Sequence, residues 1–137
     1  MTIVNFRTTK IDAEKTDKRA SSVTANASSM ITSMTLEKDA NTGEYLLVKY
    51  RYTVKYEPDI GHILLEGSLW YMNKNLKKLA KKEKDKVSVE SEVMEEVSTA
   101  IIREALLESV EISRRLNLPP PMNLPKVEVK PKQGKAA

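Results

Sequence analysis

The sequence has no cysteine and a single histidine, His62. Without cysteine there is no disulfide bond, thiolate metal site or cysteine nucleophile, and one histidine offers no imidazole pair for a metal ion. Only four glycines occur, and none belongs to a loop that could cradle phosphate. The neighbouring carboxylates Glu95 and Glu96 diverge on a helix surface, so they do not form an acid–base pair. We therefore expect no catalytic residue, no metal site, no cofactor and no enzyme activity.

Long apolar runs are also missing. The first residues, MTIVNFRTTK, lack the apolar stretch of a secretory signal, and no window reaches the roughly 18 apolar residues of a membrane span. We expect a cytoplasmic protein without a membrane span. The 137 residues fit one domain, which we place at residues 1–129, followed by a disordered basic tail at residues 130–137.

The charged residues occur in blocks of one sign. The formal net charge is +4, but residues 74–86 hold seven lysines, whereas residues 88–112 hold seven acidic residues against Arg103 alone. Clustered lysines can bind phosphates by releasing counterions, which makes a basic nucleic-acid- or ribosome-associated protein an alternative function. The lysine run contains no aromatic side chain for base stacking, so a solvated linker is its other interpretation and nucleic acid is the less favoured partner.

Alternating apolar residues identify the clearest strand, Tyr45–Tyr56, where every even position from Leu46 onward is apolar. Pro58 and Gly61 then indicate a turn. The next apolar run, His62–Met72, is therefore predicted to fold back as the antiparallel partner of a hairpin.

Two further strands are predicted upstream of this hairpin. A cluster of turn residues at 39–43 places a strand at Ser28–Glu37, which produces a meander, and residues 2–11 form a fourth strand. The segment Glu14–Ser29 between them is polar and rich in small residues, so we expect a loop or a mobile crossover there.

The apolar period changes to that of a helix after Met72. One stripe consists of Val93, Val97, Ile101, Ala105 and Ile112, and a second, about 100° away, consists of Ile102, Leu106 and Val110. Prolines after Leu118 end the helix. Two stripes give more apolar surface than one sheet face requires, so we expect a homo-oligomer. The predicted class is α+β: a four-stranded antiparallel sheet, a meander, followed by a long C-terminal helix and a proline-rich exit.

Strand alternation also predicts which residues face the helix. This set is Tyr50, Tyr52 and Val54, with Ile63, Leu65, Leu69 and Tyr71 on the next strand. The opposite face carries apolar residues without a partner, and methionines that we expect along one side of the preceding strand suit a surface that accommodates varied shapes. The candidate polypeptide-binding residues are Met30, Met34, Leu47, Leu64, Trp70 and Met72. Their alternative role is in the core or a subunit interface.

Three segments resemble the SecB family of export-type holdase chaperones. Pro121–Val127 resembles the family's stretch of proline, one residue, Leu-Asn-Leu, two residues and valine after its long helix. Arg103-Glu104 falls where that family also has an Arg-Glu pair. The hairpin Tyr45–Met72 is similar in length and pattern to the family's third and fourth strands.

The resemblance to SecB implies an antiparallel sheet, a dimer formed through edge strands and helices, and a homotetramer built as a dimer of dimers. It also implies ATP-independent holding of unfolded or nascent polypeptides along an apolar groove. Family members use acidic sheet residues to engage the SecA motor in protein transport, whereas this chain is basic overall. That difference argues against SecA as a partner and favours another client, as in SecB-like chaperones linked to toxin–antitoxin systems.

Overall fold

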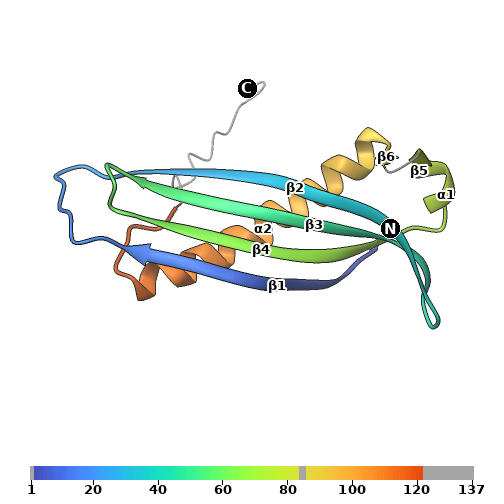
Figure 1. Cartoon of the computed structure of the whole chain (residues 1–137), viewed down its shortest axis with the longest axis horizontal. Coiled ribbons are helices and arrows are strands. Elements are labelled where there is room, and N and C mark those ends of the chain that lie inside the picture. The colour runs from blue at the N-terminus through green and yellow to red at the C-terminus, as the bar shows by residue number, and fades with distance from the viewer. Residues whose placement is uncertain (1, 84–85, 122–137) are drawn as a thin grey trace, which may run out of the picture.

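The computed structural model describes residues 2–83 and 86–121. Four long strands form the main sheet, and a short helix, a small hairpin and one long helix follow them (Figure 1). The elements are β1 (Thr2–Lys15), β2 (Thr24–Asp39), β3 (Gly43–Glu57), β4 (Gly61–Met72), α1 (Leu76–Leu79), β5 (Ala80–Glu83), β6 (Lys86–Val89) and α2 (Ser91–Arg115). The predicted α+β class, with a four-stranded antiparallel sheet and a long helix after it, is confirmed.

The strand order of the main sheet is β1-β4-β3-β2, with every pair antiparallel. The meander therefore consists of β2, β3 and β4, whereas β1 lies beside β4 at the far edge. Because short turns join β2 to β3 and β3 to β4, the free side of β4 is left for β1 to pair with. The result is a Greek-key arrangement in which residues 16–23 connect the two outer strands.

The loop expected at Glu14–Ser29 is shorter than predicted. Glu14 and Lys15 end β1, and β2 already begins at Thr24, so that only residues 16–23 connect the strands. Thr24–Ser29 pair with residues 57–52 of β3. Small polar side chains do not prevent this pairing because the ladder hydrogen bonds come from the main chain. The sequence prediction was wrong here because it relied on the scarcity of large apolar residues.

The lysine run is not a linker. Lys74 and Asn75 lie in a turn, the other described residues form α1, β5 and the first residue of β6, and Leu76 and Ala80 are buried in the core. Leu79, Val87 and Val89 pack against the same cluster. The apolar residues between the lysines therefore hold this segment on the domain, while the lysine side chains that the structure describes are exposed.

Helix α2 covers one face of the sheet, which we call the inner face (Figure 1). All seven residues predicted to face the helix are buried, and so are Val93, Val97, Ile101 and Ala105 on α2. The helix ends at Arg115, three residues before Leu118. Asn117 adopts a left-handed conformation (φ 56°), and the Leu118 N–H donates to the Ser113 carbonyl at 2.8 Å.

The second stripe of α2 is only partly covered. Within this stripe the Ile102 side chain is 46% exposed, whereas Leu106 and Val110 are half-buried; Leu107, outside the stripe, is 63% exposed. The sheet therefore leaves apolar surface on the helix, as expected from two stripes. The Pro121–Val127 motif beyond Pro121, the end of the predicted domain and the predicted tail at 130–137 lie outside the described residues.

Candidate functional site: an apolar patch on the outer face of the sheet

The outer face is the side of the sheet opposite α2, and no described helix covers it (Figure 1). Its side chains come from alternate positions of each strand, because successive residues point to opposite faces. At the end of the sheet where β4 stops, Leu47 and Val4 both lie opposite Trp70 in the strand register. This places apolar groups from three strands in one row.

An aromatic stack joins Trp70 of this row to Tyr45, two residues before Leu47 on β3. The rings of Tyr45 and Trp70 lie 3.9 Å apart between centroids at an interplanar angle of 15°. Met72 is two residues beyond Trp70 on the same face of β4. Every member of the group is partly exposed. We call it the Trp70 patch: Val4, Tyr45, Leu47, Trp70 and Met72.

A polar belt crosses the outer face beyond the patch. The Arg51 Nε lies 2.9 Å from Glu66 Oε2, and the His62 Nε2 lies 3.5 Å from Asp12 Oδ1. Leu64 sits within this belt between Thr53 and Asp12 in the register. It is six residues from Trp70 along β4, about 20 Å at the usual strand rise. Leu64 is therefore separated from the Trp70 patch.

The two candidate methionines of β2 lie on opposite faces. A β-bulge between Ile31 and Ser33 shifts the alternation, so Met30 pairs with Arg51 on the outer face and Met34 pairs with Val48 on the inner face. Met30 is 56% exposed, whereas Met34 packs against the core. The expectation that both methionines line one side of the strand was wrong because sequence alternation does not reveal the extra residue.

Of the six candidate residues, the structure thus brings together Leu47, Trp70 and Met72. Sequence reasoning missed Val4 and Tyr45. Tyr45 has the same odd numbering as Leu47, so strand parity already placed it on the outer face. Val4 could be found only from the pairing of β1 with β4, which aligns it with Trp70.

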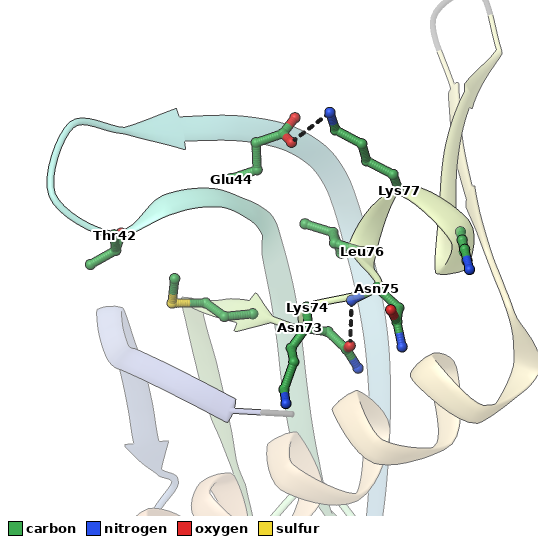
Figure 2. Close-up of a pocket in the computed structure, with 9 residues that line it drawn as sticks. Thr42, Glu44, Asn73, Lys74, Asn75, Leu76 and Lys77 are labelled. Atoms are coloured by element: carbon green, nitrogen blue, oxygen red, sulfur yellow. Dashed lines mark hydrogen bonds and ion pairs between the residues drawn. The ribbon is translucent and has the colours of Figure 1, made fainter.

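A cavity of about 540 Å³ adjoins the patch where β4 leaves the sheet (Figure 2). Met72 lines this cavity and also belongs to the Trp70 patch. Thr42 from the β2–β3 turn lines it as well. That turn is held by Asp39, whose Oδ2 accepts hydrogen bonds from the backbone N–H groups of Asn41 (2.9 Å) and Thr42 (3.0 Å). These bonds lower the pKa of the Asp39 carboxyl below its usual 3.8.

The described residues contain no group of three or more potential metal ligands. Within the same part of the chain, no helix is both long and apolar enough to cross a membrane. On the outer face, the apolar side chains of the Trp70 patch are bordered by the ion pairs of the polar belt.

No family model and no curated protein matches this sequence. Among solved structures, the chain is similar to a SecB-like chaperone from Mycobacterium tuberculosis, solved in complex with a ChAD peptide from the HigA1 antitoxin. The TM-score is 0.56 at 16% sequence identity, and the match covers 87% of this chain and 85% of that chain. The fold is SecB-like.

The match is at the level of the fold, a four-stranded antiparallel sheet with α2 on one face. The Arg103-Glu104 pair, one basis of the sequence resemblance, lies on the exposed side of α2. These two residues therefore do not contribute to the core that defines the SecB-like fold.

Proposed function

We propose that this protein is an ATP-independent holdase chaperone that binds unfolded or nascent polypeptides through the Trp70 patch. The observation that carries the proposal is an uncovered apolar patch on a SecB-like fold. The similar M. tuberculosis chaperone was solved with a bound peptide, which supports a polypeptide as the ligand.

The composition of the patch suits varied clients. Trp and Tyr side chains give large contact areas with few rotatable bonds, and they dominate binding energy at many interfaces. Met72 adapts to different apolar shapes because its thioether chain is unbranched and polarizable. A client held this way needs no nucleotide, since burial of apolar surface supplies the free energy.

Self-association belongs to the same proposal. The exposed side chains of Ile102 and Leu107 on α2 form apolar surface away from the Trp70 patch, so subunits could pair through α2 while the outer face stays open. We propose a homo-oligomer, a dimer of dimers, acting in the cytoplasm on polypeptide clients and catalysing no reaction.

The experiment is an aggregation assay with several unrelated unfolded clients, with and without ATP. We expect the protein to slow aggregation equally in both conditions. Replacing Trp70 and Leu47 by Ser should remove most of this effect because both side chains belong to the patch.

Leu64→Ser is the matched control, since it removes apolar area from the same sheet face but outside the patch. Circular dichroism and urea unfolding must show that each variant is folded. If the folded patch variant protects clients as well as the unmodified protein does, the patch is not the binding site. If the unmodified protein protects none of the clients, the holdase function is wrong.

A further inference from the structure

We propose that the Trp70 patch and the lysine-lined cavity beside it form one composite site, which prefers apolar client segments that carry acidic residues. This inference rests on the proposed chaperone function and names the class of polypeptide that the site prefers. Met72 lines the cavity and belongs to the patch, so the two parts are continuous.

Basic side chains border the cavity on several sides. Lys74, Lys77 and Lys78 all line it, and all three are exposed. Figure 2 shows Lys77 reaching across to Glu44 of β3, with Nζ 3.7 Å from Oε1, while Lys74 extends in a different direction. Among the described residues, Lys74 and Lys78 form no ion pair. Their charges are therefore free to attract a carboxylate of a bound segment.

The backbone that carries these lysines is held in place. The Asn73 Oδ1 accepts a hydrogen bond from the Asn75 N–H at 2.9 Å, and Asn73 Nδ2 donates to the Tyr71 hydroxyl at 3.1 Å. Leu76, between the lysines, is buried in the core. A preorganised backbone lowers the entropy lost when the lysines meet a ligand, although their side chains must still order.

The charges of the lysines that line the cavity determine which polypeptide segment the site prefers. A segment lying on Trp70 and Met72 passes beside the lysines, so an acidic residue next to its apolar residues gains attraction there, and a lysine or arginine is repelled. A nucleic acid fits less well because Glu44 lines the same cavity and Glu83 follows on β5, which interrupts the positive surface that a phosphate backbone requires.

Trp70 is the only tryptophan, so its fluorescence reports directly on this site. The probes are three synthetic peptides with the same Leu- and Val-rich centre and no aromatic residue, flanked by Glu, Gln or Lys. At low salt we expect the Glu peptide to bind most tightly and the Lys peptide least. For two or three exposed charge pairs, the Glu and Gln peptides should differ in Kd by roughly three- to tenfold.

The test variant is Lys74→Gln with Lys78→Gln. It should bind the Gln peptide as before and lose the preference for the Glu peptide. The control is Lys15→Gln with Lys55→Gln, which removes the same charge at the other end of the sheet. This control should keep the preference because Lys55 pairs with His62, which is eight residues from Trp70 along β4, about 26 Å at the usual strand rise, and so cannot contact a segment bound at the patch.

The outcomes separate this inference from the proposed function. If the Gln peptide binds as tightly as the Glu peptide, the acidic preference is wrong while the chaperone function stands. If no peptide changes Trp70 fluorescence and no client is protected, the function itself fails.

Two other results would also overturn the inference by assigning the cavity to a different occupant. One is single-stranded RNA that binds with a steep salt dependence and is lost in the Lys74/Lys78 variant, while the Glu peptide does not bind. The other is self-association that disappears in that variant, which would make the acidic α2 of a second copy the occupant.

Discussion

Three tyrosines, Tyr50, Tyr52 and Tyr56, are buried on the inner face of β3 beneath α2. Burial raises the pKa of each hydroxyl above its ordinary value of 10.0, because a phenolate is poorly solvated there. Tyr50 and Tyr56 also interact with Thr8 and with the Pro119 carbonyl, respectively. For Tyr52, burial is the only cause of the raised pKa.

These tyrosines predict a loss of stability in alkali. A pKa raised in the folded state gives a contribution that is complete below pH 10 and is lost as pH rises above it. Tyr52→Phe should change the free energy of unfolding little at pH 8 and make its decline above about pH 10 shallower. Urea unfolding at a series of pH values measures this. An unchanged decline would show that Tyr52 does not contribute to the alkaline loss.

Gly67 is a residue whose close contacts depend on strand pairing, which the sequence alone does not reveal. A Cβ on Gly67 would collide with the Arg7 carbonyl oxygen and with the Tyr50 ring. These neighbours come from two different strands, and only their pairing with β4 brings them to Gly67. Strand alternation predicted the burial of Tyr50 itself, because that depends on which face of one strand a residue occupies.

At the scale of elements, α2 presents two neighbouring isoleucines to different surroundings. Ile101 is fully buried between the helix and β3 and β4, whereas Ile102 is 46% exposed. Replacing either isoleucine by alanine changes helix propensity by the same amount. A difference between the two variants in the free energy of unfolding therefore reports on burial.

Ile101→Ala should destabilise the protein by about 2–5 kcal/mol because it leaves a cavity in the core. Ile102→Ala should cost less than about 1 kcal/mol within the subunit. Urea unfolding below the concentration of self-association compares the two variants. Equal losses would mean that α2 does not pack on the sheet through the buried stripe.

The elements that were predicted well are those with a strong local pattern. The alternation of β3 and β4 and the period of α2 are properties of one segment, so their inner faces followed from the residues alone. The bulge in β2, the extension of β1 to Lys15 and the hairpin within the lysine run depend on neighbouring strands or on the core. For this reason the sequence prediction placed Met30 and Met34 on one face of β2, whereas the structure places them on opposite faces.

At the scale of the whole molecule, apolar surface remains on two sides of the described structure. The Trp70 patch lies on the outer face of the sheet, and Met94, Ile102 and Leu107 are exposed on α2. Exposed apolar groups of this kind often mark association surfaces. The acidic residues around the α2 surface and the lysines near the patch make these two sides chemically different.

We expect light scattering at micromolar concentration to give a mass that is a multiple of the 15.5 kDa subunit, with a tetramer as the proposed state. Replacing Ile102 and Leu107 by Ser should lower that mass, because it weakens association through α2, and should leave Trp70 fluorescence unchanged. A monomer at these concentrations would contradict the oligomer and leave the exposed α2 surface without an assigned role.

The sequence by itself determined the α+β class, the β3–β4 hairpin, the buried face of each of these strands and the buried stripe of α2. Each of these follows from periodic burial along a single segment, and the apolar periodicity can be recognised in the sequence of that segment. Only the tertiary structure decided that β1 pairs with β4, that Val4 and Tyr45 join Trp70, and that three lysines line a cavity together with Met72. Those contacts join residues distant in the chain, and they are chosen by strand pairing and packing, which no local pattern encodes.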